Sequence, residues 1–294
     1  MFKKIVLATD LSADWDQIIA CAAEFKALGC THAILTHVIV TKGLVGADTV
    51  ARTESQPRLE AQRKQLEAHG FDVIVETPLG LPAFSLDDVA QRHCASLIVV
   101  GSHGKSTWWE AVLGSVSNAL LHHARFPILL INVKRLREED TGARCQLHTR
   151  ELLRHVLFPT DFSNVASLAV PLLEYFIPKG LSEVTLLHAL DVLDAYPPAV
   201  LAPAEAAARG FLKALVQRLQ TAGIPRVHSH ISKGHPIPMI LDFLKTNDFS
   251  LVVMGTQGRS LLAEILLGSV AYNIARLAPC PVLLMSKEAN SGFK

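Results

Sequence analysis

The sequence lacks the features that would place it at once in a nucleic-acid-binding or membrane class. Its 294 residues carry 28 Lys and Arg against 27 Asp and Glu, so the formal net charge is only +1. That balance gives no electrostatic case for binding nucleic acid or an anionic membrane surface. No apolar run approaches the length of a transmembrane helix. We therefore expect a globular protein that binds neither nucleic acid nor membrane.

Cysteine is scarce and carries no recognisable pattern. The five cysteines form neither a C-x-x-C pair nor a zinc spacing, and an odd number of scattered thiols is typical of a reducing compartment. The N-terminal stretch MFKKIVLATD runs straight into a strand-like segment, without a signal-peptide apolar region. The 13 histidines, including the pair His228 and His230, do not cluster with carboxylates or cysteines at metal-ligand spacing. These absences predict a cytoplasmic protein with no bound metal of its own.

Familiar nucleotide and catalytic motifs are also missing. The stretch GSHGKSTWWEAVLGS, residues 101–115, contains GKST, but the P-loop pattern needs a glycine where this chain has Val99. The dinucleotide fingerprint fails because Gly101 and Gly104 are separated by two residues and no third glycine follows in register. Neither a nucleophile elbow nor a Ser-His-Asp or Cys-His signature is present. We expect no dedicated catalysis, and a weak ATPase activity stays open.

The chain repeats itself once. The segment KKIVLATDLS (residues 3–12) matches RHVLFPTDFS (154–163), and HAILTHVI matches EVTLLHAL at the same offset of 151 residues. Farther along, SLIVVGSHGKS matches SLVVMGTQGRS at an offset of 154, which indicates a small insertion between the second and third strands of the second copy. A period of this length indicates two copies of one domain rather than a solenoid. We place the first domain at residues 1–136, a charged linker at 137–150 and the second domain at 151–294.

Within each copy, apolar strand-like runs alternate with amphipathic helical patterns. The strands are expected near 4–9, 33–39, 71–76, 96–100 and 127–133, and near 155–160, 183–189, 226–231, 250–254 and 281–285; the helices of the first copy are expected near 13–28, 52–69, 82–94 and 112–125. In the second copy, Pro171 should kink the first helix or delay its start. The pattern predicts an α/β protein with two tandem, doubly wound, five-stranded parallel sheets of strand order 3-2-1-4-5.

In such a sheet, ligands bind beyond the carboxyl ends of the strands, where the strand order reverses. Thr9 and Asp10 end the first strand and Gly101 ends the fourth, so Asp10 should face the glycine loop and accept hydrogen bonds from a sugar or a base amine. Gly101 and Gly104 would let the backbone approach a ligand and adopt positive φ. Gly114 would open a helix whose free N–H groups favour phosphate. Two alternatives stay open: a loop without ligand, and an Asp10 that only caps the first helix beside Ser12.

The pattern G-x2-G-x9-G-[ST] after a fourth strand, with a first strand ending in Asp-x-Ser, resembles the universal stress protein family. Both copies fit it without a gap, through Gly101, Gly104, Gly114 and Ser115 and through Gly255, Gly258, Gly268 and Ser269. The likeness covers nearly the whole chain, which is therefore similar to a tandem member with two such domains. The resemblance implies an adenine nucleotide as ligand, typically ATP, which can carry Mg²⁺.

The resemblance also implies roles for individual residues. Thr9 and Asp10 would contact adenosine, and the Val38 backbone would contact adenine. The ribose and phosphates would be flanked by Gly101, His103 and Gly104. The phosphate tail would be held by Gly114, Ser115 and Ser117. The matching positions of the second copy are Thr160, Asp161, Ala189, Gly255, Gly258, Gly268 and Ser269. Ala271 stands in the place of Ser117, a departure that predicts a weaker second ATP site.

On this basis we expect a nucleotide-dependent sensor or switch of a stress response. A nucleotide-independent interaction scaffold and a slow ATPase or autophosphorylating protein stay open as alternatives. Trp108 and Trp109 follow the glycine loop, where exposed apolar residues indicate a contact surface between domains or with another chain; local packing and contact with a membrane stay open as alternatives. The protein partner is not identified by the sequence.

The last strands of the two copies, FPILLINV and CPVLLMS, would leave apolar sheet edges unless something covers them. We expect the domains to pair through these strands about a pseudo-twofold axis, as in the homodimer of single-domain relatives; a homodimer of the whole chain stays open. Small-angle scattering should then give the profile of one compact particle. An elongated, two-bead profile with independently moving domains would contradict this pairing.

Overall fold

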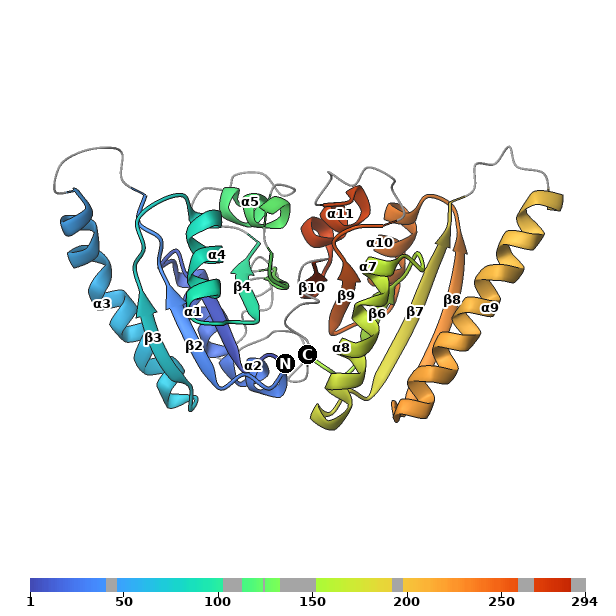
Figure 1. Cartoon of the computed structure of the whole chain (residues 1–294), viewed down its shortest axis with the longest axis horizontal. Coiled ribbons are helices and arrows are strands. Elements are labelled where there is room, and N and C mark those ends of the chain that lie inside the picture. The colour runs from blue at the N-terminus through green and yellow to red at the C-terminus, as the bar shows by residue number, and fades with distance from the viewer. Residues whose placement is uncertain are drawn as a thin grey trace. The chain divides into compact units, whose positions relative to one another are not determined.

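The computed structural model describes residues 1–40, 47–102, 113–123, 125–132, 152–191, 198–258 and 267–286. These residues form two compact units, residues 1–132 and 152–286, and each unit is a parallel sheet with helices packed on it (Figure 1). The predicted linker and the loop residues His103, Gly104, Trp108 and Trp109 lie outside the described residues. No helix in the described ranges is long and apolar enough to cross a membrane.

The sheet of the first unit has the predicted order. Its strands are β1 (Lys4–Ala8), β2 (His32–Thr36), β3 (Asp72–Glu76), β4 (Leu97–Gly101) and β5 (Ile128–Ile131), arranged β3-β2-β1-β4-β5. The pairings among them are parallel. Every residue of β4 and β5 is buried, as the continuous apolar runs predict for strands covered on both faces. The expectation that β1 and β4 are neighbours is confirmed, so the ends of these two strands border one crevice.

The helices of the first unit are α1 (Ala13–Ala20), α2 (Ala22–Ala27), α3 (Ala47–Ala68), α4 (Pro82–Arg92) and α5 (Ser115–His123). Helix α1 packs against α3, and α4 packs against α5 on the other face of the sheet (Figure 1). The prediction of one helix over residues 13–28 is wrong, because it breaks at Cys21, whose φ of −91° and ψ of 13° are not helical. Cys21 is disulfide-bonded, which the scattered cysteines of the sequence did not predict.

The second unit repeats this arrangement. Its strands are β6 (Val156–Pro159), β7 (Glu183–Leu190), β8 (Arg226–Lys233), β9 (Leu251–Gly255) and β10 (Val282–Met285), in the order β8-β7-β6-β9-β10; its helices are α7 (Asn164–Ser167), α8 (Ala169–Phe176), α9 (Pro198–Ala222), α10 (Pro236–Thr246) and α11 (Ser269–Leu277). The first helical segment breaks at Leu168. Pro171 then falls in the first turn of α8, where its missing N–H costs no helical hydrogen bond. The prediction of a kink or a delayed start at Pro171 is confirmed.

Gly210 lies inside α9, and an added Cβ would meet no atom within 4 Å. Gly210→Ala should therefore stabilise the second unit by about 0.5–1 kcal/mol, because alanine loses less backbone entropy in a helix. Gly180→Ala is the matched control: the new methyl group also has free space, but the residue has a φ of +98°. Thermal unfolding should shift upward for Gly210→Ala and downward for Gly180→Ala. Shifts in the same direction would contradict this account.

Candidate functional site

The site begins at the turn that follows β1. Leu11 has a φ of 62°, and Phe162, at the same place in the second unit, has a φ of 60°. Bulky residues rarely adopt this left-handed conformation, and such strain is concentrated at functional sites. Each turn is stabilised in the same way: the Thr9 hydroxyl oxygen accepts the Leu11 N–H at 3.0 Å, and the corresponding Thr160 bond is 3.1 Å.

A histidine anchors each turn from the neighbouring strand. Nδ1 of His37 lies 3.0 Å from the Thr9 carbonyl oxygen, and Nδ1 of His188 lies 2.7 Å from that of Thr160. A carbonyl oxygen only accepts, so Nδ1 carries the proton in both rings. The sequence reasoning missed these histidines. The signal was available, because His37 and His188 occupy the same place in the repeated segments HAILTHVI and EVTLLHAL.

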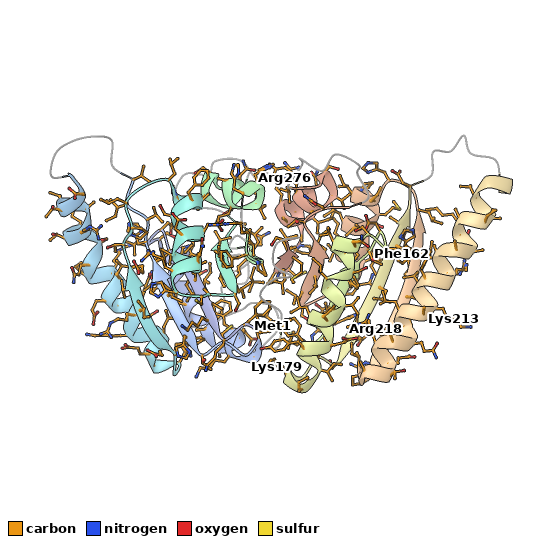
Figure 2. All side chains as sticks on the ribbon, viewed as in Figure 1. Met1, Phe162, Lys179, Lys213, Arg218 and Arg276 are labelled. Carbon is orange, nitrogen blue, oxygen red and sulfur yellow. The ribbon has the colours of Figure 1, made fainter. Side chains whose placement is uncertain are left out.

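The two turns differ in what covers them. In the first unit, the buried Gln62 of α3 accepts a hydrogen bond from the Thr9 hydroxyl at 3.0 Å, and Arg58 donates to the Leu11 carbonyl oxygen. In the second unit, the ring of Phe162, which is labelled in Figure 2, stacks on His188 with a centroid distance of 4.4 Å and contacts Phe211 of α9. The first turn is therefore supported by polar groups and the second by aromatic rings.

Asp10 uses one carboxylate oxygen for the turn and leaves the other without a partner. Oδ1 accepts the Ser12 N–H at 2.9 Å, as Oδ1 of Asp161 does from Ser163 at 3.0 Å. Oδ2 of Asp10 is buried and has no hydrogen-bond partner. An unpaired buried oxygen of this kind is costly. Ser12 occupies the N-cap position of α1 but its side chain makes no cap bond, so Asp10 has both a local role and a free acceptor.

The described glycines at the ends of β4 and β9 and in the loops that follow are needed for close packing more than for unusual backbone conformations. A Cβ on Gly255 would lie 3.0 Å from Val165 Cγ1 and 3.1 Å from the Ala166 nitrogen, so this glycine lets the end of β9 touch the start of α7. Of the loop glycines that the structure describes, none has positive φ, and that expectation is wrong for Gly101. A Cβ on Gly258 would lie 2.7 Å from Asp161 Oδ2, which confirms that the aspartate and the glycine loop face one another in the second unit.

A helix begins beside each of the turns that follow β1 and β6: α5 in the first unit and α11 in the second. The Gly114 N–H donates to the Ser102 carbonyl oxygen at 2.8 Å, and the Gly268 N–H donates to that of Thr256 at 2.7 Å. Gly268 is the N-cap of α11 and provides no side-chain cap. The first-turn N–H groups, starting at Ser115 and Ser269, are therefore the kind of backbone donors that bind anions.

Ser117 has a structural partner. Its hydroxyl donates to the Gly101 carbonyl oxygen at 2.6 Å, and the residue is buried. The hydroxyl hydrogen is thus committed to the end of β4, and the oxygen can meet a phosphate only as another acceptor. The predicted contact of Ser117 with phosphate stays a prediction, but the loss of this hydroxyl at Ala271 no longer gives a reason for a weaker second site.

Ser117→Ala should therefore lower stability and leave nucleotide affinity nearly unchanged. Removing one partner of a buried hydrogen bond costs about 1–3 kcal/mol, and Ala271 shows that the fold accepts alanine at the equivalent place. Chemical denaturation and calorimetric titration with ATP measure the two quantities separately. A large loss of affinity at unchanged stability would assign the hydroxyl to the phosphate instead.

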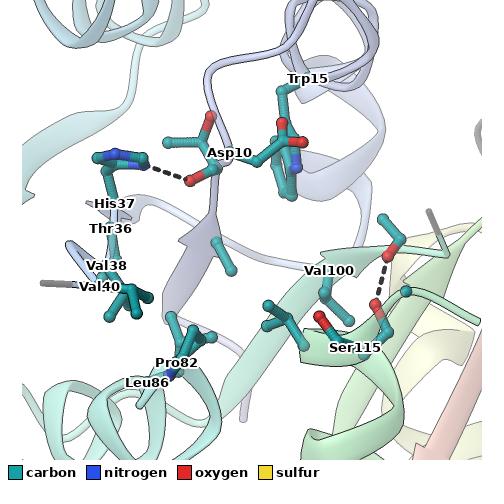
Figure 3. A pocket seen from close by; sticks show the side chains of 16 residues that line it. Asp10, Trp15, Thr36, His37, Val38, Val40, Pro82, Leu86, Val100 and Ser115 are labelled. Atoms are coloured by element: carbon teal, nitrogen blue, oxygen red, sulfur yellow. Dashed lines mark hydrogen bonds between the residues drawn. The ribbon is translucent and has the colours of Figure 1, made fainter. Parts of the chain in front are cut away.

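These elements surround a cavity of about 270 Å³ in the first unit, close to the lower end of the usual size of ligand pockets (Figure 3). Seven predicted site residues line it: Thr9, Asp10, Val38, Gly101, Gly114, Ser115 and Ser117. The structure adds lining residues that the sequence reasoning did not select, including Trp15, His37, Val40, Pro82 and Leu86. The wall is mostly apolar, with a carboxylate at one side and a helix N-terminus at the other.

The histidine pair of β8 lies away from this cavity. His228 Nε2 is 3.2 Å from Glu183 Oε1, and the His230 ring stacks on Phe243. Burial alone would raise the pKa of Glu183, but the hydrogen bond from Arg226 and the neighbouring histidines outweigh it and lower the pKa. The described ranges contain no group of three His, Cys, Asp or Glu residues that could hold a metal ion.

Comparisons with known proteins agree with this architecture. The model of the universal stress protein family matches residues 1–132 and again residues 153–286. A universal stress protein of Mycolicibacterium smegmatis is 26% identical over 297 residues, which cover 96% of each chain. Another, from Mycobacterium tuberculosis, is 30% identical over 196 residues, which cover 65% of this chain and only 61% of that protein.

Among solved structures, a universal stress protein from Archaeoglobus fulgidus has the same fold. It shares 23% sequence identity with this chain and gives a TM-score of 0.76 over 98% of this chain and 99% of that one. The family match covers both repeats, with little outside them except the predicted linker and the last residues. The chain therefore belongs to the universal stress protein family and carries two of its domains in tandem.

Proposed function

We propose that the first unit binds ATP in the cavity between β1 and β4. The observation that carries this proposal is the buried Oδ2 of Asp10, which has no partner and borders the cavity of about 270 Å³. Across the cavity, Gly114 and Ser115 begin α5, whose N–H groups favour phosphate. An adenine nucleotide matches this pair of walls, because its nucleoside offers donors and its tail is anionic.

The proposed ligand lies with its base on the apolar side of the cavity. Val38, Val40 and Leu86 provide that surface, and the Val38 backbone would pair with the base. The phosphate tail points toward Ser115. Contacts with His103 and Gly104, which lie outside the described residues, stay a prediction. Mg²⁺ would arrive with the phosphates, because the proposed phosphate contacts are hydrogen-bond donors that leave phosphate oxygens available to the ion.

The second unit has the same elements at Thr160, Asp161, Ala189, Gly255, Gly258, Gly268 and Ser269, and we propose it as the weaker site. This proposal is supported by a difference between the two units in one residue at the edge of the cavity. Val40 lies three residues after His37, and the equivalent residue three after His188 is the exposed Asp191. A carboxylate there adds negative charge beside an anionic ligand and opposes its binding.

We propose that nucleotide occupancy is the signal of a cytoplasmic stress-response sensor or switch. The experiment is mass spectrometry of the small molecules released when the purified full chain is denatured. An adenine nucleotide should be released from the wild-type chain and in smaller amount from Asp10→Asn. Asp161→Asn is the matched control and should retain most of it. Equal release from all three proteins would contradict an Asp10 site.

A further inference from the structure

Trp15 is part of the cavity wall. It is the third residue of α1, and its exposed fraction is only 3%. It nevertheless lines the cavity of the first unit. Figure 3 shows the indole beside the Asp10 carboxylate, with Val100 and Ser115 on the opposite side. Trp15 therefore shares the Asp10 side of the cavity and lies apart from both Val38 and the start of α5.

The fold does not require an indole at this position. Trp15 follows Asp10 by five residues, and the residue that follows Asp161 by five is Ala166. The Ala166 backbone lies against Gly255 at the end of β9. The first unit therefore has a large aromatic side chain where the second unit has a methyl group.

The indole also carries a donor without a partner. Among the hydrogen bonds of the described residues, none involves the Trp15 Nε1–H, and this nitrogen is not one of their buried atoms without a partner, so the N–H is accessible to a ligand. Oδ2 of Asp10 is the unpaired acceptor on the same side of the cavity. An adjacent donor and acceptor match a ligand group that both accepts and donates. A phosphate does not fit, because its charge opposes the carboxylate.

We propose that Trp15 is a specificity-determining residue that recognises the sugar of the nucleotide: its Nε1–H donates to a ribose hydroxyl oxygen while Asp10 Oδ2 accepts a hydrogen from the ribose diol. This inference rests on the proposed function. The sugar is assigned because Asp10 and Trp15 share one side of the cavity, apart from the apolar surface for the base at Val38 and from the start of α5 for the phosphates. The second unit, with Ala166, lacks this contact and discriminates less between ribose and deoxyribose.

The test is a thermodynamic cycle that compares two proteins, each with three ligands. ATP, 2′-deoxy-ATP and 3′-deoxy-ATP are titrated calorimetrically into the full-length wild type and into Trp15→Phe, which keeps an aromatic ring but loses the N–H. Trp15→Phe should bind ATP about two- to tenfold more weakly, the usual effect of one neutral hydrogen bond. The wild type should bind one of the two deoxynucleotides more weakly than ATP by that same factor. Trp15→Phe should bind this deoxynucleotide almost as tightly as ATP, because it has already lost the hydrogen bond to the missing hydroxyl group.

Ile18→Val is the matched control, since Ile18 is buried on the same helix and does not line the cavity. It should leave all three affinities unchanged. The inference is overturned if both deoxynucleotides weaken the two proteins equally, or if Trp15→Phe instead abolishes a preference for ATP over inosine triphosphate, which would assign the indole to the base. A wild-type chain that binds none of these nucleotides would refute the proposed function itself, which is a distinct result.

Discussion

Asp10→Asn should weaken ATP binding at least tenfold without destabilising the ligand-free protein. Asparagine keeps an oxygen for the Ser12 N–H, which Asp10 Oδ1 accepts at 2.9 Å. It replaces the buried, unpaired Oδ2 with an amide group. A hydrogen bond to a charged group contributes about 1.5–3 kcal/mol, which corresponds to about ten- to more than a hundredfold in affinity. The ligand-free protein loses only a carboxylate oxygen that had no partner.

Calorimetric titration with ATP and chemical denaturation measure the two effects. Asp161→Asn makes the same change in the second unit, where Asp161 Oδ1 accepts the Ser163 N–H. It should leave the tighter binding event intact. If Asp10→Asn bound ATP as tightly as the wild type, Asp10 would only stabilise its turn. If Asp161→Asn removed the tighter event, the assignment of the stronger site to the first unit would be wrong.

Gly255→Ala should destabilise the second unit by about 1–3 kcal/mol, the usual cost of forcing a methyl group into a filled space. The new Cβ would meet the backbone of Val165 and Ala166 at 3.1 Å, and backbone atoms cannot move aside as a flexible side chain can. The start of α7 would have to shift away from β9. Because α7 directly follows the turn of Asp161, binding in the second unit should also weaken.

Gly268→Ala is the matched control for this change. The nearest atom to its added Cβ is the Thr256 carbonyl oxygen at 3.4 Å, and its φ of −73° suits alanine. Urea denaturation of the two variants should separate them, with Gly268→Ala losing only about 0.5–1 kcal/mol, the amount that alanine costs relative to glycine at an N-cap. Equal stability of both variants would show that the contact between β9 and α7 is loose.

The sequence predicted the sheet because the repeat doubles each signal. An apolar run ending in Thr-Asp-x-Ser is weak alone, but its recurrence at residues 3–12 and 154–163 fixes both first strands. The positions of Asp10 and Gly101 followed from strand order alone. A break in a helix was predictable only where a residue type that disrupts helices occupies the position. Pro171 is such a residue and predicted the break in its helix, whereas Cys21 is not and gave no sign of one.

The residues that were missed share a physical reason. Trp15 recurs with Ile18, Ile19 and Phe25 at helical spacing, and that periodicity cannot distinguish a side chain in the core from one at a cavity wall. Gln62 lies on the amphipathic α3, where one buried polar residue is hidden among charged ones. The role of Ser117 depends on a carbonyl oxygen 16 residues away, a contact that only the folded chain reveals.

A crystal structure of the full chain grown with saturating ATP and Mg²⁺ tests the central claim most directly. The account predicts adenine against Val38 and Leu86, the ribose at Asp10 and Trp15, and the phosphates at the N-terminus of α5 beside Ser115. An empty crevice at saturating ATP, or a nucleotide bound elsewhere on the first unit, would contradict it.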